Sequence, residues 1–238
     1  MNLENKTIFV SGANRGIGKA IVDALLKQKV KKVYAAARKI DSLPSFGDAR
    51  VTPVQLDITD RSQIQKAVAQ AQDVDVLINN AGVLSFATVV GGEADMLKHD
   101  MDVNYFGTLS MIHAFIPMLE KKGGGAIANV ISVVGLASMA GIGGYSASKA
   151  ALHSATQAMR AELKAKKITV HGIFPGPIDT DMTKGFEMEK ASAQSTGENI
   201  VKGLVAGKED IFPDPMSTQI SELWAKDPKG LERQFAAM

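Results

Sequence analysis

Two side chains that could exchange a proton with a substrate, Tyr145 and Lys149, stand four residues apart. If this segment opens a helix, positions i and i+4 project from one face, so a phenol and an ammonium share one site. A phenol has an ordinary pKa of about 10, and a nearby positive charge lowers that pKa because it favours the phenolate. The spacing therefore predicts a proton donor and acceptor, although many solvated helices carry the same pair without any function.

A hydroxyl that could hold the substrate oxygen lies 13 residues before Tyr145, at Ser132. The run from Ala126 to Ser132 is mostly small and apolar, which indicates a buried strand that ends at this serine. From there the hydroxyl could hold a substrate oxygen against the phenol while the proton moves. Ser132 and Tyr145 together predict acid–base chemistry on a carbonyl or an alcohol.

The chain opens with a strand, a glycine-rich turn and a helix. Lys6 to Ser11 is a β-branched run, and apolar residues recur at helical spacing from Ile17 to Leu25. The turn between them reads Gly12-Ala13-Asn14-Arg15-Gly16-Ile17-Gly18. In such a unit the glycines let the backbone approach a pyrophosphate, and the amino end of the helix stabilises its charge. The alternative is a tight turn without a ligand.

The next predicted strand, from Lys32 to Arg38, ends where a dinucleotide-binding fold selects its cofactor. An acidic residue about 20 positions after the glycine turn would bind the adenosine ribose 2′-hydroxyl, but this chain has Arg38 there. A guanidinium can instead form a charge-assisted contact with a 2′-phosphate, and Arg15 is a second candidate cation. The two arginines favour NADP over NAD, unless both are solvated surface residues.

Two further strands are predicted to end in polar turns. Residues 51–58 indicate a third strand, and its Asp57 could either cap the helix expected at 61–71 or meet an adenine. Residues 75–78 indicate a fourth strand that runs into Asn79-Asn80-Ala81-Gly82. Because ligands of open α/β sheets bind at the carboxyl ends of strands, this turn is a candidate cofactor contact. An asparagine-rich turn of no function is the other interpretation.

The rest of the chain continues the alternation of strands and helices. A long helix is expected from Glu93 to about Lys121, with Asn104 in its middle. Asparagine is a poor mid-helix residue, so it could bend the helix or hold a water, although an exposed asparagine is the commoner explanation. The remaining expected elements are the strand 126–132, a pocket-lining loop at 133–144, the helix 145–166, the strand 168–173, a lid at about 181–200, a helix at 196–206 and a short strand at 210–212.

Composition excludes several classes of function. A net charge of +2 with scattered lysines does not suggest a nucleic acid or a membrane surface as the partner. The absence of cysteine excludes disulfides and thiolate ligands, and the four histidines lie too far apart in sequence to form a close metal pair, so no metal is expected. No apolar leader precedes the first strand and no apolar run of about 18 residues follows, which makes the cytoplasm the default location.

The alternation of strands and helices predicts an α/β fold with a doubly wound, mostly parallel sheet and helices on both faces. At 238 residues with no linker or repeat, one domain spanning residues 1–238 is expected. Ser132 and the polar turns then fall along one edge of the sheet, facing the site of the dinucleotide.

With these motifs in this order, the chain resembles the short-chain dehydrogenase/reductase family of the NADP-preferring type, from Lys6 to about Phe212. The resemblance is carried by Gly12-x-x-x-Gly16-x-Gly18, Asn79-Asn80-Ala81-Gly82, Asn104, Ser132, Tyr145-x-x-x-Lys149 and Pro175-Gly176. It implies a Rossmann-type fold that binds NADP(H). These motifs are specific for fold and reaction but not for substrate.

The resemblance also implies roles for individual residues. Tyr145 would be the acid and base, Ser132 would hold the carbonyl or hydroxyl, and Asn104 would position a water of the proton relay. Lys149 would bind the nicotinamide ribose and lower the pKa of Tyr145. Further cofactor contacts would be Asp57 and Ile58 at the adenine, Asn80 and Ala81 at the adenosine ribose with Gly82 in the same motif, and Ile178 and Thr180 at the nicotinamide amide, after the turn Pro175-Gly176.

The function expected from these residues is an NADPH-dependent carbonyl reductase. The residues expected to line the substrate side include no cation, which favours a small or aromatic apolar ketone, aldehyde or diketone. A dehydrogenase of a secondary alcohol or hydroxysteroid uses the same residues in reverse, and a non-catalytic NADP-binding sensor or scaffold is an alternative of another class. The family resemblance and the small residues on the helix of Tyr145 suggest a homotetramer or dimer, but those alanines could equally pack within one subunit.

Overall fold

A computed structural model describes residues 1–238 and places seven strands in one parallel sheet, in the order β3-β2-β1-β4-β5-β6-β9. These strands are β1 (Thr7–Ser11), β2 (Lys32–Ala37), β3 (Val51–Gln55), β4 (Val76–Asn79), β5 (Gly125–Val130), β6 (Ile168–Ile173) and β9 (Asp210–Ile211). The strand order changes direction at β1 and β4, and a crevice for a ligand forms at the carboxyl ends of strands on either side of such a point. The predicted doubly wound parallel sheet is confirmed.

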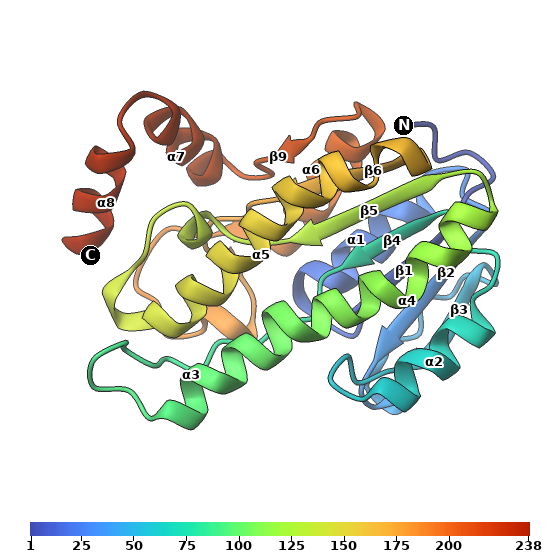
Figure 1. Ribbon diagram of the computed structural model, residues 1–238, viewed down its shortest axis with the longest axis horizontal. Coiled ribbons are helices and arrows are strands. Elements are labelled where there is room, and N and C mark those ends of the chain that lie inside the picture. The colour runs from blue at the N-terminus through green and yellow to red at the C-terminus, as the bar shows by residue number, and fades with distance from the viewer.

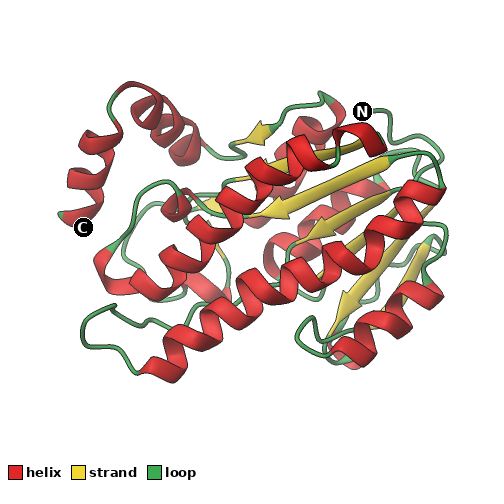
Figure 2. Ribbon diagram, in the orientation of Figure 1, coloured by secondary structure: helices red, strands yellow, loops and turns green.

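Helices cover both faces of the sheet (Figures 1 and 2). One face is covered by α1 (Gly16–Leu26) and α6 (Ala193–Val205), and the other by α2 (Arg61–Gln70), α4 (Thr108–Lys121) and α5 (Gly143–Glu162). The longer strands supply both cores because successive side chains point to opposite faces. In β1, Ile8 and Val10 pack toward α1, whereas Phe9 packs toward α4.

The long helix expected from Glu93 to Lys121 is interrupted in its middle. It consists of α3 (Ala94–Met101), a π-helical turn at Asp102–Gly107 and α4. Single π-helical turns inside α-helices are rare and occur frequently at functional sites. Asn104 lies in this turn and is completely buried, so the interpretation of an exposed asparagine is wrong.

The end of the chain forms two helices that were not among the expected elements, α7 (Pro215–Lys226) and α8 (Pro228–Ala236). Each has an aspartate as N-cap, Asp214 or Asp227, followed by a proline in its first turn. Ile220, Leu231 and Phe235 from these helices join a third apolar cluster with residues that follow β5. Figure 1 shows both helices beyond the carboxyl ends of the strands, on the same side as the start of α5.

The segment expected to form a lid, at about 181–200, is irregular only between residues 184 and 190. A 3-10 turn lies at Asp181–Thr183, and a short pair of strands, β7 (Ile178–Asp179) and β8 (Ala191–Ser192), joins the residues on either side of 180–190. Helix α6 already begins at Ala193, so it takes in the last residues of the expected lid.

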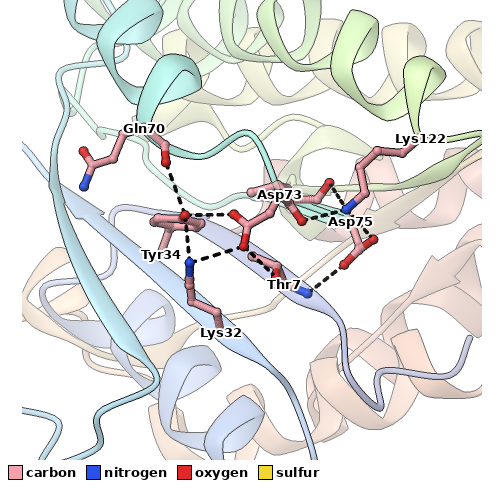
Figure 3. Close-up of polar contacts among 8 residues, drawn as sticks. Thr7, Lys32, Tyr34, Gln70, Asp73, Asp75 and Lys122 are labelled. Atoms are coloured by element: carbon pink, nitrogen blue, oxygen red, sulfur yellow. Dashed lines mark hydrogen bonds and ion pairs between the residues drawn. The ribbon is translucent and has the colours of Figure 1, made fainter.

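The amino ends of the strands are joined by a polar network (Figure 3). The Tyr34 hydroxyl donates to Asp73 at 2.8 Å, and the ammonium of Lys32 donates to the same carboxylate at 3.2 Å. Asp75 accepts from the backbone N–H of Thr7 at 2.8 Å and from the ammonium of Lys122 at 2.7 Å. These bonds connect β1, β2, β4 and the end of α4, which fixes the sheet at the edge opposite the crevice.

None of the helices combines the length and apolar character needed to span a bilayer.

Candidate active site

The predicted pair lies in the first two turns of α5. Lys149 is buried, with only 3% of its surface exposed, and its Nζ lies 5.5 Å from the ring centroid of Tyr145. The ammonium donates a hydrogen bond of 2.9 Å to the carbonyl of Val130, the last residue of β5. The helix begins at Gly143 and not at Tyr145 as expected, so both side chains belong to a formed helix.

Ser132 follows β5, which ends at Val130 and not at the serine as expected, and it faces the first turns of α5. Its hydroxyl accepts a hydrogen bond of 3.3 Å from the backbone N–H of Val134 and lies 3.4 Å from the carbonyl of Pro175. Ser132 also lowers the pKa of the Tyr145 phenol. Ser132, Tyr145 and Lys149 therefore come together from the strand end and the helix.

The pKa of Tyr145 is shifted in the direction opposite to the one predicted from the sequence. Burial raises the pKa of Tyr145 above its ordinary value, Ser132 opposes this rise, and the carboxylate of Asp100 adds to it. The lowering expected from Lys149 is not found, because the loss of hydration dominates and the ammonium is directed to Val130. Burial lowers the pKa of Lys149 to about 8, and Asp100 opposes this shift.

Asn104 connects the π-helical turn to two other parts of the site. Its Oδ1 accepts from the backbone N–H of Val83 at 2.8 Å, and its Nδ2 donates to the carbonyl of Val83 and to Oγ of Ser148, both at 2.9 Å. A Cβ on Gly82 would lie 2.9 Å from Oδ1 of Asn104 and 3.5 Å from Nζ of Lys149. The last residue of the Asn79–Gly82 motif is therefore packed directly against two predicted catalytic residues.

The glycine turn fits a ligand that needs a close backbone approach and an anion site. Gly12 and Gly16 have φ of +65° and +54°, which favour glycine, and a Cβ on Gly18 would lie 2.0 Å from the carbonyl oxygen of Gly12. Helix α1 begins with no side-chain cap and no acidic residue in its first turn. Its N–H groups and positive dipole end are thus free to bind a phosphate, beside Asn14, Arg15 and Ile17.

The amide of Asn80 joins this turn to the end of β4. It donates to the carbonyls of Ser11 and Gly12 at 3.1 and 2.9 Å, and Oγ of Ser11 accepts from the backbone N–H groups of Asn80 and Ala81. The asparagine-rich turn therefore holds β1 and β4 together at the crevice.

Of the two predicted cations at the cofactor end, only Arg15 has a partner within the chain. Arg38 is exposed after β2 and takes part in no ion pair or side-chain hydrogen bond. Arg15 forms an exposed ion pair of 2.7 Å with Asp181. Next to Arg38 lies an open hollow of about 600 Å³, lined by Lys39, Ile40, Asp41, Ser42 and Gln55.

Asp57 and Ile58 follow β3, which ends at Gln55 and is shorter than expected. Asp57 accepts from the backbone N–H and hydroxyl of Thr59 at 2.9 and 2.7 Å, whereas α2 is capped by Asp60. The alternative in which Asp57 caps this helix is therefore wrong. The side chain of Ile58 is buried in the core, so it could meet a ligand only through its backbone.

The turn after β6 reaches the glycine turn. Gly176 donates its backbone N–H to the carboxylate of Asp214 at 2.9 Å, and Pro175 and Ile178 are buried. A Cβ on Gly16 would lie 3.1 Å from Cγ2 of Thr180. Thr180 thus lies beside the amino end of α1, although it is far away in sequence.

Comparison with known proteins relates the chain to one protein family. The family model described as short chain dehydrogenase matches residues 6–191. The chain belongs to the short-chain dehydrogenase family. It is 34% identical to a 3-oxoacyl-[acyl-carrier-protein] reductase of Thermotoga maritima over 77% of this chain and 78% of that protein. An uncharacterized oxidoreductase of Staphylococcus saprophyticus is 31% identical over 77% and 82% of the two chains.

One solved structure is similar along nearly the whole chain. It is a short chain dehydrogenase from Burkholderia cenocepacia in complex with NADP, with a TM-score of 0.93 and 36% identity over 99% of each chain. The predicted family and Rossmann-type fold are therefore confirmed, and the chain is an oxidoreductase of this family.

The structure of this short-chain dehydrogenase adds two residues to the site that the sequence analysis missed. Asp100, from α3, is completely buried beside the first turn of α5, and Ser148 accepts the hydrogen bond from Asn104. Asp100 gave no signal in the sequence because an aspartate among charged residues on a helix is usually solvated. Its spacing of four residues from Asn104 would have placed it on the same face of a helix.

Proposed function

We propose that this short-chain dehydrogenase reduces a carbonyl with NADPH, with Tyr145 as the proton donor. The bound cofactor supplies the hydride, and the protein supplies alignment and the proton. The observation that carries the proposal is the convergence of Ser132, Tyr145 and Lys149 beside an uncapped glycine turn. The relative from Burkholderia cenocepacia, which was crystallised with NADP, supports this choice of cofactor.

The protein's part in the reaction follows from these positions. Ser132 donates its hydroxyl hydrogen to the carbonyl oxygen and holds it against the phenol of Tyr145, which transfers its proton to that oxygen. Because burial raises the pKa of Tyr145, the phenol is protonated at neutral pH, as a proton donor must be. Lys149, still mostly charged at pH 7 with a pKa of about 8, would bind the nicotinamide ribose through its ammonium.

Asn104 is proposed to fix the geometry around this pair. Both hydrogens of its amide are used by Val83 and Ser148. A water of the proton relay would therefore bind at its main-chain carbonyl or at the remaining lone pair of Oδ1.

The cofactor would lie along the carboxyl ends of the strands. Gly12, Asn14, Gly16, Ile17 and Gly18 would receive the pyrophosphate at the start of α1. Arg38 and Arg15 would bind the 2′-phosphate, and the unpaired guanidinium of Arg38 beside an open hollow supports its role. The remaining proposed contacts are Asp57 and Ile58 at the adenine, Asn80, Ala81 and Gly82 along the riboses, and Pro175, Gly176, Ile178 and Thr180 at the nicotinamide.

The surroundings of Tyr145 favour an apolar substrate. Tyr145 packs against a cluster that contains Val133, Val134 and Met139. Residues 181–190 would cover this side as a lid, and its Phe186 contacts Phe86 edge to face, with ring centroids 5.7 Å apart. Small or aromatic ketones, aldehydes and diketones fit such walls. The reaction is reversible, so a secondary alcohol or hydroxysteroid would be oxidised by the same residues.

A second candidate substrate is a 3-oxoacyl thioester. It is favoured by the 34% identity to the 3-oxoacyl-[acyl-carrier-protein] reductase of Thermotoga maritima. The two candidates share the chemistry and differ in the group that carries the carbonyl.

The test is NADPH oxidation, followed by absorbance, across aldehydes, ketones, diketones and an acetoacetyl thioester. We expect turnover of apolar ketones or diketones. Turnover of the thioester alone would favour the second candidate, and NADPH binding without turnover of any carbonyl, or of any alcohol with NADP, would favour a non-catalytic NADP-binding protein.

Assembly into a dimer or tetramer is also proposed. The small residues Ala147, Ala150 and Ser154 on α5 are exposed and do not pack within the subunit core. Light scattering of the purified protein tests this proposal, and a monomer would contradict it.

A further inference from the structure

A buried carboxylate lies beside the proposed active site. Asp100 has no exposed surface, and its Oδ1 accepts hydrogen bonds from the backbone N–H of Ser85 at 3.1 Å and from its hydroxyl at 2.9 Å. Its Oδ2 is also buried and has no hydrogen-bond partner. A buried carboxylate with an unused oxygen is costly, so its presence requires an explanation.

The position of Asp100 repeats that of Asn104 one turn earlier. Asn104 faces Ser148 of α5 and holds Val83, whereas Asp100 lies beside Gly144 and holds Ser85. Oδ2 of Asp100 lies 3.4 Å from where a Cβ of Gly144 would be. Asp100 and Asn104, one helical turn apart, thus hold Ser85 and Val83 of the loop after β4. They hold this loop against two successive turns of α5, at Gly144 and Ser148.

The loop held in this way borders the substrate side. Phe86 follows Ser85, has a φ of +51° and contacts Phe186 of the proposed lid. A positive φ is unusual for a residue with a side chain, so neighbouring contacts must hold the backbone there. The two hydrogen bonds to Asp100 act on the residue immediately before this turn.

The charged and titratable groups that face Asp100 are Tyr145 and Lys149 of α5 and His99 of its own helix. His99 is exposed, whereas Lys149 is buried. The two groups that Asp100 influences inside the protein are therefore the proposed proton donor and its ammonium neighbour.

The geometry points to Asp100 as a positioning residue of the reaction, whose carboxylate holds the loop after β4 against α5 and places a negative charge beside Tyr145 and Lys149. The inference rests on the proposed function, because the charge matters only if Tyr145 transfers a proton. Interaction with the carboxylate of Asp100 raises the pKa of both Tyr145 and Lys149, so it keeps the phenol protonated and the ammonium charged. Both effects favour reduction over oxidation near neutral pH.

The test is the pH profile of kcat for carbonyl reduction in Asp100→Asn. Asparagine keeps the shape and the oxygen that accepts from Ser85 but removes the charge. We expect the alkaline limb of the profile to move down by about one pH unit, the size expected for one charge nearby in the protein interior. Asp100→Ser is a second neutral variant with the same expectation should the asparagine variant fail to fold.

Two controls distinguish the effect of the Asp100 charge from the effect of its hydrogen bonds. Asp102 is partly exposed and pairs with Lys98. Asp102→Asn therefore removes a nearby charge that does not face the site, and it should leave the pH profile of kcat unchanged. Ser85→Ala removes one hydrogen bond but keeps the carboxylate, so we expect a higher KM with the pH profile retained. A folded Asp100→Asn whose profile coincides with that of the unmodified protein would overturn the inference.

An inactive parent enzyme would count against the proposed function and not against this inference. In that case NMR of the Lys149 side chain follows its ionisation without any substrate. The midpoint, at a pKa of about 8 in the parent, should be lower in Asp100→Asn because the carboxylate that favours the ammonium is gone, and an equal midpoint would overturn the inference.

Discussion

The side-chain amide of Asn104 donates a hydrogen bond of 2.9 Å to Oγ of Ser148, the neighbour of Lys149. Because the same amide also pairs with both backbone groups of Val83, three segments are fixed together at one point. These segments are the π-helical turn, the loop after β4 and helix α5. A displacement of any one of them is therefore transmitted to Lys149.

Gly82→Ala tests this connection. The new Cβ would lie 2.9 Å from Oδ1 of Asn104, so we expect a loss of about 1–3 kcal/mol in the free energy of unfolding and a lower kcat. Gly141→Ala is the matched control, because a Cβ there meets nothing within 4 Å. Denaturant titration and steady-state kinetics measure both variants, and equal stability of the two would contradict the prediction.

Tyr145→Phe removes only the hydroxyl that is proposed to donate the proton. We expect kcat for carbonyl reduction to fall by about 10²–10⁴-fold, the usual contribution of a positioned acid, with NADPH affinity nearly unchanged. Fluorescence titration with NADPH and single-turnover kinetics check the two parts. Turnover within a few-fold of the parent would exclude Tyr145 as the acid.

Arg38→Asp should reverse the preference for the cofactor. Loss of a charge-assisted contact with the 2′-phosphate, together with repulsion from the new carboxylate, should weaken NADPH binding by about 10- to 100-fold or more. NADH lacks that phosphate and should bind as well as before or better. Lys66→Asp reverses a charge on the exposed side of α2 and serves as the control; the same loss in both variants would point to a general effect of charge.

Lys149→Met tests the cost of burying an ammonium. The pKa of Lys149 is about 8 in the folded protein and 10.5 as its ordinary value, so above pH 8 the folded state releases its proton before the unfolded state does. The unfolded state then binds more protons, and stability rises with pH. Between pH 8 and 10.5, the free energy of unfolding of the parent should therefore rise by as much as about 3 kcal/mol relative to that of Lys149→Met.

Denaturant unfolding of both proteins at several pH values measures this difference. A constant difference would mean that Lys149 keeps an ordinary pKa. Activity should fall over the same range, because the neutral amine is a weaker hydrogen-bond donor to the nicotinamide ribose that Lys149 is proposed to bind.

The sheet and the pair of Tyr145 and Lys149 could be predicted because their signals are local. Buried parallel strands are short apolar runs, and Tyr145 and Lys149 are related by the repeat of a helix. Ser132 could be placed because a strand ends there. The fold then brings these ends to one edge, as the topology of such sheets requires.

Other features depend on tertiary contacts that no local pattern contains. The burial of Asn104 and Asp100 follows from a π-helical turn and from hydrogen bonds to Val83 and Ser85, which are close only in the folded chain. The raised pKa of Tyr145 likewise results from burial. Helices α7 and α8 are different, because Asp214-Pro215 and Asp227-Pro228 are recognisable helix starts in the sequence.

These two C-terminal helices lie outside residues 6–191, the part of the chain that the family model matches, yet they pack on the cluster that contains Val133, Val134 and Tyr145. Under the proposed function, the segment that completes the substrate side is separate in sequence from the glycine turn and from α5. Replacing residues 213–238 with the corresponding segment of a relative should exchange the range of substrates while the cofactor and the chemistry stay the same. Substrate recognition would then depend on a different segment of the chain from cofactor binding and proton transfer.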